Sequence, residues 1–139
     1  MRSRLVRTLY VLGLTVSAAA VAVPAQARDV KFNVPFTFVV NGETLPPGTY
    51  EVTSELSVLL VRGYDHGAAV VTARAESREE RDPSLLFNRY GDRYILVEAW
   101  MGGDSGRVLP TSRLERQLIE TARRESAGNA AGRFVIRAR

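Results

Sequence analysis

The stretch from Val30 to Val40 alternates apolar and mostly polar residues, which is the pattern of a half-buried β-strand. Pro35 lies in its middle and cannot donate a ladder hydrogen bond, so an edge strand or a bulge is expected there. Because such a strand must bury its apolar face against other strands, the chain is expected to build a β-sheet fold. The residues of that apolar face are Val30, Phe32, Val34, Phe36, Phe38 and Val40.

Turn residues divide the following sequence into short segments spaced by roughly ten residues. Asn41-Gly42 favours a tight type I′ turn, and Gly91-Asp92 predicts a hairpin in which Tyr90 pairs with Arg93. That register places Trp100 on the same face as Leu85, Phe87, Tyr94 and Leu96. Further strands are expected at Glu43–Leu45, Thr49–Thr53, Val58–Arg62, Ala68–Ala75, Leu85–Tyr90, Arg93–Trp100 and Phe134–Arg137.

Two segments are interpreted as loops. Glu76–Pro83 is dense in charge, and Met101–Arg107 contains three glycines. Neither segment shows the alternation of a half-buried strand.

A helix is predicted from about Arg113 to Arg124, because Ser112 and Glu115 form a capping box. Its apolar residues Leu114, Leu118 and Ile119 are expected to pack on a sheet. The fold class is therefore an all-β protein: a small antiparallel sandwich or barrel of about six to eight short strands with one C-terminal amphipathic helix.

Residues 1–27 have the layout of a secretory signal peptide: a basic start, an apolar stretch and a small-residue end. The apolar stretch Leu9–Val23 is shorter than the roughly 20 residues of a spanning helix. Cleavage is expected between Ala27 and Arg28, with Ala25 completing the recognition pattern. Residues 28–139 would then form a single exported domain, periplasmic or extracellular, without a stable membrane span.

Composition excludes several classes of function. The chain has no Cys and one His, which excludes thiol catalysis and cysteine-ligated metals, and no cofactor or metal site is expected. Removal of the leader would leave 16 basic and 15 acidic residues and a net charge of +1. Nucleic-acid binding is not expected, because it needs a concentrated positive field.

Four segments contain between them aromatic residues, turn residues and arginines. They are Val34–Gly42 (VPFTFVVNG), Leu45–Tyr50 (LPPGTY), Arg89–Tyr94 (RYGDRY) and Leu109–Arg116 (LPTSRLER). Together they resemble an uncharacterised family of small exported β-rich proteins common in acidobacteria. The resemblance covers most of the chain after residue 27 and implies export and a β-rich fold. The family has no established activity, so the resemblance implies no catalytic residues.

Gly103-Asp104-Ser105-Gly106 is similar to the nucleophile segment of trypsin-like serine proteases. A serine nucleophile needs an oriented base, and the single histidine, His66, lies in a glycine-flanked turn. We therefore interpret the tetrapeptide as a loop and His66 as a solvated turn residue, and we expect no enzyme activity. A calcium site is not expected either, because arginines alternate with the acidic residues Glu76, Glu79, Glu80 and Asp82.

Aromatic and arginine side chains are concentrated in the predicted hairpin. Such mixtures build recognition surfaces, although cross-strand packing accounts for the same residues. The candidate binding residues are Arg89, Tyr90, Arg93, Tyr94 and Trp100.

The residues leave three functions open. The first is a non-catalytic binding or structural module of the cell envelope or secreted fraction, whose partner is an envelope protein, a glycan or a small ligand. The second is a barrel-type carrier of a small apolar ligand, and the third is a small serine hydrolase. The strand Val30–Val40 also offers a route to self-association by strand addition.

Overall fold

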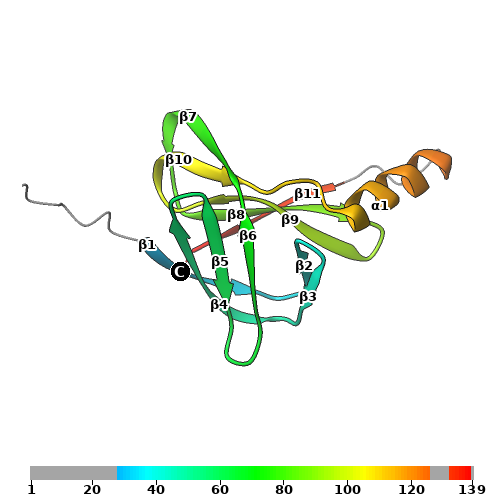
Figure 1. The fold of residues 1–139 in the computed structure, drawn as a ribbon, viewed down its shortest axis with the longest axis horizontal. Coiled ribbons are helices and arrows are strands. Elements are labelled where there is room, and N and C mark those ends of the chain that lie inside the picture. The colour runs from blue at the N-terminus through cyan, green and yellow to red at the C-terminus, as the bar shows by residue number, and fades with distance from the viewer. Residues whose placement is uncertain (1–27, 126–131, 139) are drawn as a thin grey trace, which may run out of the picture.

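The computed structural model describes residues 28–125 and 132–138, which form two β-sheets and one helix (Figure 1). The first sheet has the order β1 (Arg28–Val34), β4 (Gly48–Glu55), β5 (Val58–Arg62), β6 (Gly67–Val71). The second has the order β11 (Gly132–Arg137), β8 (Ser84–Tyr90), β9 (Arg93–Trp100), β10 (Gly103–Val108), β7 (Ala73–Arg81). The expected all-β sandwich with one C-terminal helix is confirmed, with eleven strands in the described residues instead of six to eight.

The predicted strand Val30–Val40 is two strands. β1 ends before Pro35, and β2 (Phe38–Val40) follows it and pairs with both β3 (Glu43–Leu45) and β9. The break at Pro35 and the edge position of β1 are as expected. Phe32, Val34, Phe38 and Val40 are all fully buried, so the alternation predicted the correct face.

The Asn41-Gly42 turn joins β2 to β3 with Val40 paired to Glu43. Asn41 has φ 49° and Gly42 has φ 90°, the positive values that a type I′ turn requires at both central residues. This turn prediction is confirmed.

β6 and β7 are consecutive strands that belong to different sheets. β6 pairs with β5, and β7 pairs with β10 after the single residue Thr72. The amide and hydroxyl groups of Thr72 both donate to the Ser57 carbonyl, at 2.7 and 3.1 Å. One nearly continuous strand therefore passes from the first sheet into the second.

The prediction of loops at Glu76–Pro83 and Met101–Arg107 is wrong. Most of the first segment lies in β7, and most of the second lies in β10. β7 is an edge strand, where charged side chains face solvent and protect the edge from further pairing. The hydrophobic alternation that identifies a half-buried strand is therefore missing from this segment.

The β8–β9 hairpin has the predicted register near its turn, with Tyr90 opposite Arg93 and Asn88 opposite Ile95. A register shift between Leu86 and Phe87 then changes the pairing. As a result, Trp100 pairs with Ser84 and lies on the face opposite Leu96, which corrects the predicted placement of its side chain.

The helix α1 (Arg113–Arg124) has the predicted bounds, and the Ser112 hydroxyl accepts a hydrogen bond from the Glu115 amide at 3.1 Å. Its packing differs from the prediction. Leu114, Leu118 and Ile119 are only partly buried, and Glu115 is the buried residue of the helix, with 5% of its surface exposed. The helix projects from one end of the sandwich instead of covering a sheet (Figure 1).

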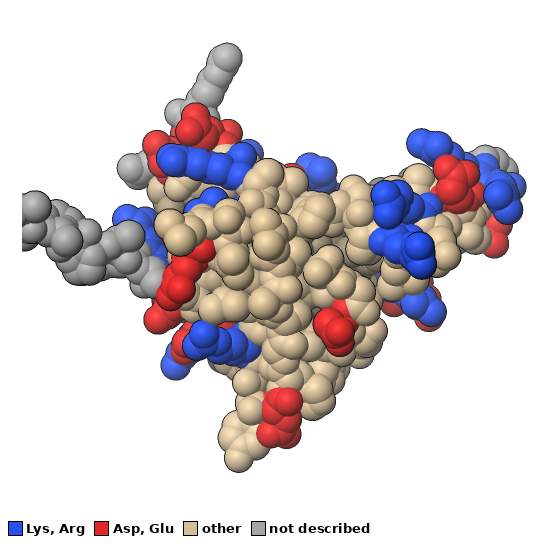
Figure 2. Space-filling view, in the orientation of Figure 1, with Lys and Arg blue, Asp and Glu red and all other residues tan. Residues whose placement is uncertain are grey.

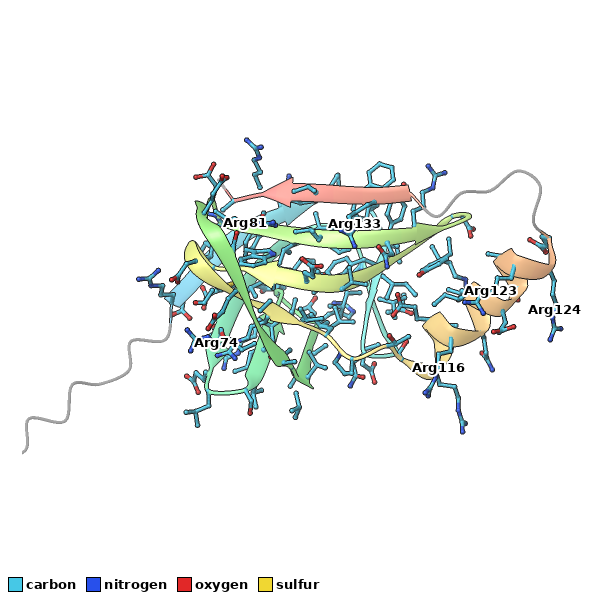
Figure 3. All side chains as sticks on the ribbon, turned by 90° about the horizontal axis from the view of Figure 1, so that it is seen from above. Arg74, Arg81, Arg116, Arg123, Arg124 and Arg133 are labelled. Atoms are coloured by element: carbon cyan, nitrogen blue, oxygen red, sulfur yellow. The ribbon has the colours of Figure 1, made fainter. Side chains whose placement is uncertain are left out.

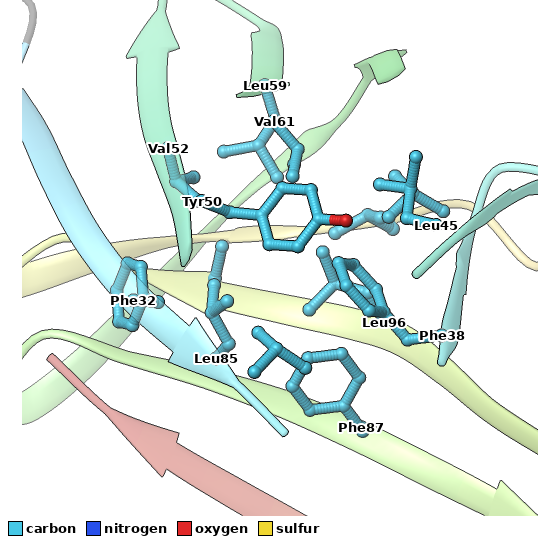
Figure 4. Packing of buried hydrophobic residues seen from close by; sticks show 14 of the residues in the cluster. Phe32, Phe38, Leu45, Tyr50, Val52, Leu59, Val61, Leu85, Phe87 and Leu96 are labelled. Carbon is cyan, nitrogen blue, oxygen red and sulfur yellow. The ribbon is translucent and has the colours of Figure 1, made fainter. Parts of the chain in front are cut away.

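The space between the sheets is filled by side chains from both of them (Figure 4). The rings of Phe38 and Tyr50 meet edge to face at 5.0 Å, and those of Phe38 and Phe87 at 5.5 Å. Leu59, Leu85 and other fully buried residues pack around them, so the interior is a close-packed core.

Candidate functional site

A cleft of about 690 Å³ lies at one end of the sandwich, between the β1–β4 side of the first sheet and the β10–β7 side of the second. This volume falls within the range of small-molecule sites. Its walls carry arginine, serine and glycine residues and one acidic residue, Asp104. The charged and hydroxyl side chains besides Asp104 are Arg28, Arg74, Arg107, Ser54, Ser77 and Ser105.

Arg74 and Arg107 are direct cross-strand partners in the β7–β10 pair. Like charges directly opposite one another destabilise an antiparallel pair. An anion between the two guanidinium groups would remove that repulsion.

Two arginines of the cleft, Arg107 and Arg28, donate hydrogen bonds to uncharged acceptors. Arg107 Nε donates to Ser54 Oγ at 2.8 Å, which joins β10 to β4 across the cleft. Arg28 Nη1 donates to the Gly102 carbonyl at 3.4 Å. Because these acceptors are neutral, the charges of both arginines are left available to a ligand.

The cleft carries a net positive charge of two, from three arginines and Asp104. Arg74 has an ion-pair contact, with Glu76 at 3.6 Å, and both side chains are largely exposed. An exposed pair of this kind contributes little to stability. Among the described side chains, neither Arg28 nor Arg107 forms an ion pair.

Ser105 and His66, the nucleophile and base that a serine hydrolase would need, lie in different parts of the fold. Ser105 lines the cleft, whereas His66 is exposed in the β5–β6 turn, where its carbonyl accepts from the Gly63 amide at 2.6 Å. That turn is at the bottom of Figure 1, and β10 is at the upper left. The structure therefore does not bring the two residues together.

Gly106 has a packing role in the tetrapeptide that resembles a nucleophile segment. It pairs with Trp100 in β9, and a Cβ atom at this position would lie 2.6 Å from Trp100 Cδ2. Arg81 also packs over the indole, with its Cζ 4.5 Å from the ring centroid. With Nε1 donating to Glu98 at 3.1 Å, Trp100 keeps only 4% of its surface exposed.

The five predicted binding residues do not form one surface. Arg89 and Tyr94 lie together: Tyr94 stacks on Phe36 at 4.0 Å between ring centroids, and the Arg89 Cζ is 5.7 Å from the Tyr94 centroid. Phe134 from β11 meets Tyr94 edge to face at 5.4 Å. Aromatic packing accounts for most of this cluster.

The remaining three predicted residues lie elsewhere. Tyr90 donates its hydroxyl to Glu115 Oε1 at 3.2 Å and so joins β8 to α1. Burial, together with the nearby Glu115 carboxylate, raises the pKa of Tyr90 above its usual value. Arg93 is exposed beside the hairpin turn, and Trp100 is buried at the far end of β9.

On the face shown in Figure 2, most charged side chains lie toward the left and right ends, a few acidic ones lie at the lower centre, and much of the central surface is uncharged. Arg116, Arg123 and Arg124 lie on α1, whereas Arg74 lies at the opposite end (Figure 3). The cleft therefore forms an arginine group separate from that of the helix. In the described part of the chain, no cluster of acidic or histidine side chains could hold a metal ion, and no helix could cross a membrane.

The cleft residues were not found from the sequence. Arg28, Ser54, Arg74 and Arg107 come from four strands and share no local motif. Pairing of β7 with β10 brings Arg74 opposite Arg107. Arg74 belongs to the predicted strand Ala68–Ala75, but Arg107 and most of β7 lie in the two segments predicted as loops. Predicted cleavage residues Ala25 and Ala27 lie outside the described residues, and Arg28 is the first residue of β1.

Comparison with family models, curated proteins and solved structures gives no match to this chain.

Proposed function

We propose that the protein is an exported, non-catalytic binding module that holds a small oxyanion, a phosphate or carboxylate group, in the arginine-lined cleft. The observation that carries this proposal is the placement of Arg74 directly opposite Arg107, with Arg28 in the same cleft. A guanidinium group binds carboxylate and phosphate through paired hydrogen bonds, and such charge-assisted bonds are strong.

The packing of the interior supports binding at the surface over transport of an apolar ligand inside a barrel. A carrier needs an apolar chamber, and the side chains between these sheets form a close-packed cluster. Separation of Ser105 from His66 likewise gives no support for hydrolysis.

Export is proposed on the layout of residues 1–27. The final location is the periplasm or the medium.

Titration followed by amide NMR tests the cleft. Inorganic phosphate and citrate, added separately, should shift the amide signals of Gly103, Ser105 and Gly106. Arg107→Gln should weaken binding of the preferred anion by about tenfold or more, since it removes charge-assisted hydrogen bonds.

Arg116→Gln is the matched control, because it removes the same charge from α1 at the other end of the molecule. The two anions distinguish a tetrahedral phosphate from a carboxylate as the recognised group. Equal loss in both variants would mean that only the overall charge matters, and no shift with either anion would refute the proposed function.

A further inference from the structure

We propose that removal of the leader completes the oxyanion cleft, because the α-ammonium group left on Arg28 becomes one of the groups that bind the anion. This inference rests on the proposed function of the cleft. A leader peptidase would hydrolyse the Ala27–Arg28 bond with water. The carboxylate departs with Ala27, and the new amine on Arg28 takes up a proton.

The first residue of β1 lies at the cleft and is fixed there. Arg28 pairs with Ser54, whose hydroxyl accepts the hydrogen bond from Arg107. Paired Cα atoms in an antiparallel ladder are about 4.5–5.5 Å apart, so the backbone of Arg28 lies beside Ser54, the residue that orients the Arg107 guanidinium group.

Two further contacts hold this end of the strand. Arg28 Nη1 reaches across to the Gly102 carbonyl, and the next residue, Asp29, accepts a hydrogen bond of 2.5 Å from Thr53. Chain termini are usually poorly ordered unless they are tied down in this way. A new terminus at Arg28 would therefore be held beside the ligand instead of moving in solvent.

Cleavage changes the chemistry of the Arg28 nitrogen. In the precursor it is a neutral amide with one hydrogen, and after cleavage it is an ammonium with three donors. The charged groups of the cleft around it are its own guanidinium, Arg74, Arg107 and Asp104. The added charge raises the attraction for an oxyanion, so the precursor should bind weakly and the processed protein more tightly.

The sequence offers a precise way to test this inference, because Lys31 is the only lysine in the chain. In a Lys31→Arg variant that has been exported and processed, the α-amino group is the sole amine. Intact mass establishes that the protein begins at Arg28. Acetylation then neutralises this group alone.

Phosphate binding is measured by amide NMR for the processed Lys31→Arg protein, its acetylated form and the Arg107→Gln variant of the same protein. Acetylation should weaken binding by about tenfold, as expected for loss of one charge-assisted contact. Equal binding before and after acetylation would overturn the inference and leave the cleft function standing. Absence of binding in all forms would overturn both.

A second readout does not depend on affinity. The α-amino group, labelled with ¹³C-methyl groups by reductive methylation, is titrated with and without saturating phosphate. An ordinary α-amino pKa is about 7.7–8.0, and a bound anion in contact with the ammonium should raise it. If phosphate shifts the cleft amides but leaves this titration unchanged, or if the exported protein begins at another residue, the inference is wrong.

Discussion

Substituting Gly106 with alanine tests how β10 packs against β9. The new Cβ would lie 2.6 Å from Trp100 Cδ2 and 2.8 Å from Cε2 and Cε3. Carbon atoms normally meet at about 3.5–4.0 Å, so the indole would have to move by about 1 Å. That movement disturbs the contact with Arg81 and the hydrogen bond to Glu98.

The size of the effect follows from two opposing contributions. Overpacking of this kind costs about 1–3 kcal/mol. Alanine is favoured over glycine in a strand by about 0.5–1 kcal/mol, and Gly106 is not among the glycines with positive φ, so its backbone accepts a side chain. Gly106→Ala should therefore destabilise the protein by about 0.5–2 kcal/mol.

Urea denaturation followed by far-UV circular dichroism measures this loss, and Trp100→Ala supplies the control. Without the indole, the Gly106→Ala substitution has room and should be neutral or stabilising by up to about 1 kcal/mol. The sign of its effect thus depends on Trp100. If Gly106→Ala stabilised the wild-type protein and the Trp100→Ala variant equally, the indole of Trp100 would not pack against Gly106.

Two further predictions concern the helix and the tyrosines Tyr50 and Tyr90. Leu118→Ala should lower the free energy of unfolding by about 1 kcal/mol or less in urea melts, because Leu118 is only partly buried. Leu59→Ala, in the core, should lower it by about 2–5 kcal/mol. Equal losses would show that α1 packs as tightly as the core. Burial raises the pKa of both Tyr50 and Tyr90, so the stability tied to their neutral hydroxyls should be complete below about pH 10 and be lost as the pH rises through the raised values. Absorbance titration at 295 nm should lose a late-ionising component in Tyr90→Phe; an unchanged titration curve would contradict the burial and the Glu115 contact.

Local signals in the sequence predicted the elements whose structure is determined locally. The Asn41-Gly42 turn, the Tyr90–Arg93 pairing and the helix bounds depend on neighbouring residues, and all three agree with the structure. The register shift in the β8–β9 hairpin has no such signal. It moves Trp100 to the other face, which local alternation could not foresee.

The cleft could not be predicted because its residues meet only through long-range strand pairing. Arg74 and Arg107 face each other because β7 and β10 pair, and neither strand shows hydrophobic alternation. β7 lacks alternation because it is an exposed edge strand rich in charged residues. β10 lacks it because two of its residues are glycines, and one of them, Gly106, leaves space for Trp100. The helix packing was mispredicted for a related reason, since a capping box determines where a helix begins but not what it contacts.

The passage of one strand through both sheets at Thr72 ties their unfolding together. Separation of the β5–β6 pair would release the hydrogen bonds that Thr72 makes with Ser57 and free the first residues of β7, which pair with the end of β10. The layers of many sandwiches are joined only by loops, whereas here a break in one layer removes support from the other. We therefore expect the two sheets to open as one cooperative unit, and the arginine-lined cleft, whose walls come from both sheets, to be lost in the same step.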